Sequence, residues 1–222
     1  MMALHSAAMA GNPEAVSAAL AAGADACELD DYENSALHLL AAYGHGQGDR
    51  WEFVAEQDTL TVTDAGAANS VVQLAETAAR LLAAGAAAVL EAENSYEKTP
   101  LAEACVHGNL TVANALLGAS ASMGATDTDG WPLLHAAAKH GHPEVCRLLL
   151  QHGADVNALH CGLTALHSAA SSIWRVRAGV VARVLIEAGA APCAKDAAVQ
   201  GQTAAEMATA NGWSESERAC FA

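Results

Sequence analysis

The sequence predicts an all-α fold built as a stacked array of short helical repeats, and three observations lead to this prediction. A block around a leucine recurs with a fixed period, since Leu4 and Leu37 are 33 residues apart and Leu101 and Leu134 are again 33 apart. Hydrophobic residues make up 53% of the chain but aromatic residues only 4%, and small apolar side chains suit closely packed helices. Glycines break the helical stretches at matching places. Units of this size bury a core only against their neighbours.

The same phase carries through most of the chain. Leu134 to Leu166 is 32 residues, whereas Leu37 to Leu101 is 64, one period plus an insertion of about 31 residues. The insertion is expected near residues 46–67, at the turn between the two helices of the second repeat, where insertions usually fall. The second helix of that repeat is expected to resume at Val71.

The best-kept copy, residues 127–157, predicts each element of a repeat. Gly141 can end the first helix in a left-handed conformation, Pro143 can occupy the first turn of the second helix, and Gly153 can end it. The copy resembles the ankyrin-repeat family at Gly130, Leu134-His135, Ala136-Ala137, Gly141-His142, Leu149-Leu150 and Gly153-Ala154-Asp155. The resemblance implies an ankyrin-repeat solenoid of about five repeats with a degenerate C-terminal cap repeat and a long insertion in the second repeat.

We expect a single domain over residues 1–222, and the repeat phase places its boundaries. The first copy lacks a preceding turn and is expected to act as the N-terminal cap. The fifth copy has roughly four extra residues in its helix–helix turn, around residues 171–176. The repeats are expected at approximately 1–30, 31–93, 94–126, 127–158, 159–196 and 197–222.

Charge and composition exclude several classes of function. The net charge is −15, of which −13 falls in residues 1–111, so phosphate backbones would be repelled and nucleic acid is not expected as a partner. The longest uncharged apolar run, residues 81–90, is too short to span a bilayer, so no membrane insertion is expected. No secretory signal is recognised, and six cysteines without any C-x-x-C spacing favour a reducing compartment, cytoplasmic or nuclear.

Four histidines share one phase of the repeat, at His5, His38, His135 and His167. Recurrence at the repeat period indicates a structural role, with each imidazole bonding to a neighbouring turn. The alternative is a zinc site, because His135, His140, His142 and Cys146 offer suitable donors. The structural interpretation is preferred, so no metal and no cofactor are expected.

Catalysis is not expected, although two nucleophile–base pairs can be drawn. Cys105 with His107, and Ser168 with His167, lie close in sequence on one helix, where neighbouring side chains point in different directions. The chain has no glycine-rich phosphate loop after a strand. We therefore expect neither enzymatic activity nor a small-molecule substrate.

The resemblance implies a protein partner, held by the turn tips and the inner helices of the concave face. Every tyrosine of this aromatic-poor chain falls on those phases, and aromatic anchors are typical of binding hot spots. The alternative is that these rings cover the seam between repeats. The expected binding residues are Asp31, Tyr32, Asn34, Tyr43, Tyr96, Lys98, His107, Asp129, Trp131, Lys139 and His140. The acidic N-terminal half favours a partner with a basic surface.

The insertion is a second candidate surface, since Trp51 and Phe53 stand among acidic residues. It could fold back on the array or become ordered on a partner. Residues 174–177 lie at the corresponding turn three repeats later and are basic. Two other functions remain open: an assembly subunit of a larger complex held through residues 46–67, and a regulator that inhibits a partner enzyme.

Overall fold

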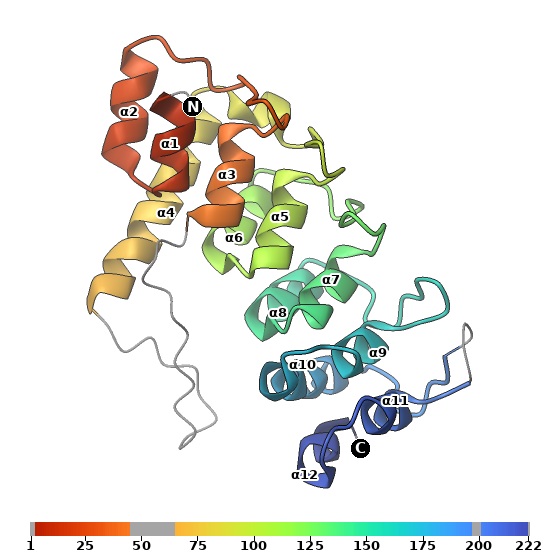
Figure 1. The fold of residues 1–222 in the computed structure, drawn as a ribbon. Helices are drawn as coiled ribbons and strands as arrows, with labels where there is room; N and C mark the ends of the chain where they lie inside the picture. The colour runs from red at the N-terminus through yellow and green to blue at the C-terminus, as the bar shows by residue number, and fades with distance from the viewer. Residues whose placement is uncertain (1–2, 45–64, 197–200, 222) are drawn as a thin grey trace. The chain divides into compact units, whose positions relative to one another are not determined.

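The computed structural model describes residues 3–44, 65–196 and 201–221, and these are helices joined by turns (Figure 1). No β-strand occurs within these three ranges, and the paired backbone segments at the turn tips are isolated bridges such as Leu29 with Ser35. The chain forms two compact units. Unit 1 consists of Met1–Leu101 with Thr111–Ala121, and unit 2 of Ala102–Leu110 with Ser122–Ala222. The prediction of an all-α repeat array is confirmed.

Unit 1 is built on two helix pairs and a further helix. α1 (Ala3–Met9) packs against α2 (Pro13–Ala21) and α3 (Ala36–Tyr43). α4 (Ala65–Ala83) packs against both α2 and α3, and the short 3-10 helix η1 (Ala86–Val89) follows it. All but the first residue of α6 (Leu110–Gly118) also belongs to this unit.

Unit 2 repeats the same helix pair. α5 (Pro100–His107) supplies most of its residues to this unit. α7 (Leu133–Lys139) packs against α8 (Pro143–Gln151), and α9 (Ala165–Ala170) packs against α7 and α10 (Arg175–Glu187). α11 (Ala204–Ala210), α12 (Glu215–Arg218) and η2 (Ala219–Phe221) complete it.

The recurring leucines form the core of both units, as their spacing predicts. Each is at most 4% exposed to solvent, and each is the second residue of the first helix of its repeat: Leu4, Leu37, Leu101, Leu134 and Leu166. At the C-terminus the core is closed by Trp213 and Phe221, whose rings meet edge to face at 5.3 Å. Periodic apolar burial of this kind supplies most of the stability of helices this short.

The glycine at the helix–helix turn is required for two reasons. Gly108 and Gly141 have φ of +74° and +73°, the left-handed region predicted for a helix end. A Cβ atom at Gly108 would stand 2.3 Å from Nδ1 of His142, so the imidazole has room only because the side chain is absent. Pro143 occupies the first position of α8, as expected.

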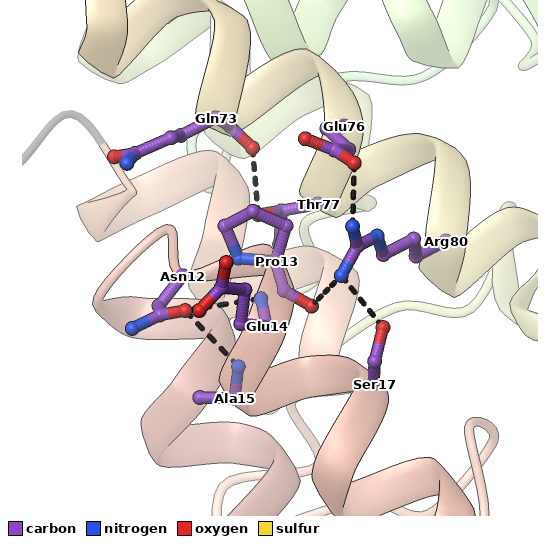
Figure 2. Close-up of polar contacts among 9 residues, drawn as sticks. All are labelled: Asn12, Pro13, Glu14, Ala15, Ser17, Gln73, Glu76, Thr77 and Arg80. Atoms are coloured by element: carbon purple, nitrogen blue, oxygen red, sulfur yellow. Dashed lines mark hydrogen bonds and ion pairs between the residues drawn. The ribbon is translucent and has the colours of Figure 1, made fainter.

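The second helix of the second repeat begins earlier than its sequence predicts. α4 begins at Ala65, six residues before Val71, so part of the expected insertion is helical. Arg80 fixes α4 to α2: its guanidinium donates to the Ser17 hydroxyl at 2.7 Å, to the Pro13 carbonyl and to Glu76 (Figure 2). The remainder of the insertion, with Trp51 and Phe53, lies outside the described residues.

The extra residues of the fifth repeat do not lengthen its turn as expected. Four residues separate α9 from α10, against three between α7 and α8, whereas α10 has 13 residues against nine in α8. The addition is therefore almost entirely one more helical turn at the start of α10, because four residues are close to one turn of an α-helix.

Candidate functional site

The four recurring histidines link successive repeats. Each is buried, and each Nε2–H donates to a backbone carbonyl of the following turn tip. The bonds run from His5 to Asn34 (3.1 Å), His38 to Lys98 (3.0 Å), His135 to Leu163 (3.1 Å) and His167 to Gln202 (3.1 Å). The structural interpretation of these histidines is confirmed.

The residue just before the first helix of the repeat determines whether the second ring nitrogen, Nδ1, has a hydrogen-bond partner. Ser35 offers its N–H (3.1 Å) and hydroxyl (2.8 Å) to Nδ1 of His38, and Thr164 does the same for His167. Pro132 has neither group, and Nδ1 of His135 is buried without a hydrogen-bond partner. Burial lowers the pKa of His135, and the Leu163 carbonyl only partly opposes it.

The residues weighed for a zinc site serve other purposes. Nε2–H of His142 donates to the Val106 carbonyl at 2.9 Å, and burial lowers the pKa of His142 to about 4. Cys146 is fully buried, and burial raises its pKa. Over residues 3–44, 65–196 and 201–221, no group of three or more His, Cys, Asp or Glu is placed to hold a metal ion.

The members of both nucleophile–base pairs drawn from the sequence have other surroundings or partners. Cys105 is buried, and burial raises the pKa of its thiol to about 12, while His107 pairs with Glu103 at 3.2 Å. The Ser168 hydroxyl donates to the Thr164 carbonyl at 3.4 Å. A thiol with so high a pKa behaves as a small apolar group.

The turn tips of unit 1 are held by an acceptor side chain at their first residue. In tip two (residues 30–34) a carboxylate oxygen of Asp30 accepts from the N–H groups of Tyr32 and Asn34, both at 2.9 Å. In tip three (residues 94–98) Asn94 accepts in the same way from Tyr96 (3.0 Å) and Lys98 (3.2 Å). Burial alone would raise the pKa of Asp30, but these hydrogen bonds outweigh it and lower the pKa.

Two hydrogen bonds join tips two and three into one surface. The Ser95 N–H donates to the Tyr32 carbonyl at 2.9 Å, and the Asn94 side chain donates to Oδ1 of Asn34 at 2.9 Å. Tyr32 is 59% exposed and Tyr96 52%. Two large aromatic side chains are therefore presented to solvent from a backbone that is fixed by its own hydrogen bonds.

Acidic residues flank the two tyrosines along the chain. Asp31, Glu33 and Glu97 are exposed, and Glu33 (φ +61°) and Glu97 (φ +57°) adopt the left-handed conformation that Gly130 occupies in the fourth repeat. These two glutamates were not among the expected binding residues; their alignment with Gly130 is the sequence signal that could have identified them. Lys98 is half-buried.

Two expected binding residues of unit 1 do not belong to this surface. The Asn34 side chain is already bonded to Asp30 and Asn94, so it holds the tip together. Tyr43 is 54% exposed but is the last residue of α3, about 10 Å along the helix from the tip at its start. The structure therefore brings together Asp31, Tyr32 and Tyr96.

In unit 2 the aromatic residue of the turn tip at residues 127–131 stands two positions later than the tyrosines do in theirs, and it is covered. Trp131 is half-buried, with the His160 ring 4.8 Å from its own ring and Nζ of Lys139 5.6 Å from its centroid. Lys139 also pairs with Asp129 at 3.5 Å. Trp131 thus matches the alternative in which the ring covers the seam between repeats, and Asp129 and Lys139 gather around it.

The remaining expected residues of unit 2 lie on the helices. His107 is exposed on α5, beside Glu103. His140 follows α7, and its ring stacks on that of His142 at 6.4 Å. Ile173, 84% exposed before α10, is a surface residue that the repeat pattern did not single out.

Comparison with known proteins agrees with this architecture. Family models described as ankyrin repeats match residues 4–48 and 119–196, which together take in more than half of the chain. Ankyrin repeat protein nuc-2 of Neurospora crassa is 32% identical over 178 residues, covering 76% of this chain and 16% of the relative. SH3 and multiple ankyrin repeat domains protein 2 of Homo sapiens is 32% identical over 144 residues, covering 64% of this chain and 7% of the relative.

The chain belongs to the ankyrin-repeat family, as its sequence pattern predicts. Proteins of this family generally bind other proteins and are typically non-catalytic. The chain spans less than a fifth of the length of either relative. Among the helices described, none is both long and apolar enough to cross a membrane.

Proposed function

We propose that this chain is a non-catalytic binding module that captures a protein with a basic surface through tips two and three of unit 1. The observation that carries the proposal is the pair of tyrosines, Tyr32 and Tyr96, each more than half exposed on two tips that are bonded to each other. Exposed aromatic side chains on a rigid backbone lose little entropy on binding, so they make efficient anchors.

The charge around the tyrosines supports a basic partner. Asp31, Glu33 and Glu97 place carboxylates beside both rings, and residues 1–111 carry a net charge of −13. Complementary charge raises the association rate and orients the partner. A guanidinium group of the partner could also stack on a tyrosine ring.

The other expected residues extend the proposal. Lys98 is the last residue of tip three and Tyr43 ends α3 of the same unit, while Asp129, Trp131, Lys139, His107 and His140 would form separate contacts on unit 2. We infer one ankyrin-repeat domain over residues 1–222, because the boundary between the units falls inside the third repeat and not between repeats. The buried thiols of Cys105 and Cys146 support a reducing location, cytoplasmic or nuclear.

The test begins by identifying the partner through photo-crosslinkers placed at Tyr32 and at Tyr96 in the full chain, followed by mass spectrometry. The affinity of the purified partner is then measured for Tyr32→Ala/Tyr96→Ala. We expect the dissociation constant to rise by a factor of about 30 or more, because two hot-spot side chains are removed. The helical circular dichroism should not change.

Two controls separate the alternatives. Val71→Ala/Val72→Ala removes exposed apolar side chains from α4 of the same unit and should leave the affinity unchanged. Deletion of residues 47–66 should also preserve binding; if it abolishes binding while the tyrosine variant binds normally, the chain is an assembly subunit held by its insertion. A captured enzyme whose turnover falls on binding would identify the chain as an inhibitor.

A further inference from the structure

The start of α10 in unit 2 carries a second surface, which we call the α10 patch: the exposed residues Ile173, Trp174, Arg175 and Val176 with the half-buried Arg177. Ile173 is 84% exposed, and Trp174 and Val176 are each 55% exposed. Arg175–Ala178 is the extra turn that makes α10 four residues longer than α8. The fifth repeat therefore projects apolar side chains at a position where α8 has no helical residue.

The backbone of the α10 patch is fixed although its apolar side chains are exposed. The Trp174 N–H donates to the hydroxyl of buried Ser172 at 3.1 Å. Arg175 donates to the carbonyls of Gly212 (2.9 Å) and Asn211 (3.2 Å), which ties the extra turn to the end of α11.

The preceding repeat also fits closely beneath the patch. A Cβ atom at Gly141 would stand 3.0 Å from Cβ of Arg177 and 3.3 Å from Cβ of Trp174, so the extra turn rests directly on this glycine. Contacts on both sides thus hold a segment whose apolar side chains are each more than half exposed. Such preorganisation reduces the entropy lost when a partner binds.

The charge of the α10 patch is opposite to that of the chain. Residues 171–186 contain three arginines and no acidic residue, in a protein of net charge −15. The first turn of α10 has no acidic side chain, although the helix dipole favours one there. Arginines at the positive end of a helix are locally unfavourable, and an anionic group bound there would offset this cost.

We propose that the α10 patch binds an acidic peptide segment of another protein, with an apolar side chain of the segment seated on Ile173, Trp174 and Val176. The carboxylates of the segment face the arginines and the N–H groups at the start of α10. This surface is separate from the tips of unit 1 and selects a partner of opposite charge. An anionic membrane is the less favoured occupant, because the net charge of the whole chain repels it.

The test selects random peptides displayed on phage against the immobilised full chain, with counter-selection against Ile173→Ser/Trp174→Ser. We expect the enriched peptides to be acidic and to contain a large apolar residue. Synthetic copies should bind the double variant about tenfold or more weakly, since an apolar anchor is lost. Their affinity for the wild-type chain should fall as sodium chloride is added.

Controls make each outcome decisive. Ile173→Ser alone, the mildest change, should weaken binding in the same direction, and the melting temperature of each variant reports its folding. Val71→Ser/Val72→Ser should bind the peptides normally, as should Tyr32→Ala/Tyr96→Ala, which distinguishes this proposal from the function assigned to the tips. Enrichment of basic peptides, or no enrichment against the double variant, overturns the proposal. So does patch-dependent binding to phosphatidylserine vesicles without peptide enrichment, which would make the surface a membrane contact.

Discussion

The turn tips of both units carry an aromatic residue, but at different positions: Tyr32 and Tyr96 are the third residues of their tips, whereas Trp131 is the fifth residue of the tip at residues 127–131. In unit 1, Tyr32 and Tyr96 are more than half exposed and lie among carboxylates. In unit 2, Trp131 is covered by the His160 ring and by Lys139. A shift of two positions along the tip therefore separates rings that remain available to a partner from a ring that packs against the neighbouring repeat.

The largest expected effect tests the histidines of unit 2 by pH. Because the pKa of His142 falls from 6.5 to about 4 on folding, the unfolded chain binds more protons between these values. Stability is complete above pH 6.5, falls as the pH drops toward 4, and has lost up to about 3 kcal/mol below it. His135 contributes in the same direction.

The measurement is urea denaturation followed by tryptophan fluorescence, to which Trp131, Trp174 and Trp213 of unit 2 contribute. His142→Gln, which cannot titrate here but can still donate, should flatten the loss, whereas His152→Gln at the exposed end of α8 should not. An equally steep loss in His142→Gln would show that other groups cause it.

The second test compares the aromatic residues directly. Trp131→Ala should lower the free energy of unfolding by about 2 kcal/mol, because it removes a half-buried ring and its contacts with His160 and Lys139. Tyr32→Ala should change it by no more than about 0.5 kcal/mol, as is usual for exposed positions. Equal losses in urea denaturation would remove the distinction between the two tips.

The third test replaces the residues that precede two of the helices. The two substitutions should change the free energy of unfolding in opposite directions. Ser35→Ala removes the hydroxyl that bonds Nδ1 of His38 and should cost about 1 kcal/mol. Pro132→Thr supplies a partner for Nδ1 of His135 and should gain about 0.5 kcal/mol, the new bonds being offset by a freer unfolded chain. Thermal unfolding of both variants checks the signs; a loss in Pro132→Thr contradicts the proposed reason.

The smallest effect concerns the left-handed glutamates of unit 1. Glu97→Gly should stabilise the chain by about 0.5 kcal/mol, because glycine adopts a φ of +57° without the strain of a side chain. Gly130→Ala, at φ +77°, should destabilise it by about 1 kcal/mol. If Glu97→Gly leaves the free energy of unfolding unchanged, the left-handed conformation of Glu97 is not strained. The tips that contain Glu97 and Gly130 would then differ at this position in charge alone.

The parts predicted from sequence are those that repeat. The period located the core leucines, the linking histidines and the helix break at Gly141, because equivalent residues of each repeat pack against equivalent neighbours. The length of the extra segment in the fifth repeat could be predicted from the sequence, but its conformation could not. A four-residue addition can either lengthen a turn or add one turn to a helix. Nor could the covering of Trp131 be predicted, because it depends on side chains 29 residues away in His160 and eight away in Lys139.

The imidazole bonds also bear on how the array opens and closes over time. A repeat array behaves as a row of nearest-neighbour links, and each His-to-carbonyl bond strengthens one link. In the third repeat Ala102 stands where the imidazole would be, so within unit 2 the link from α5 to the fourth repeat has no such bond and depends on the His142 contact with Val106. Brief opening of unit 2 should therefore begin beside α5, and mild acid should make it more frequent by protonating His142.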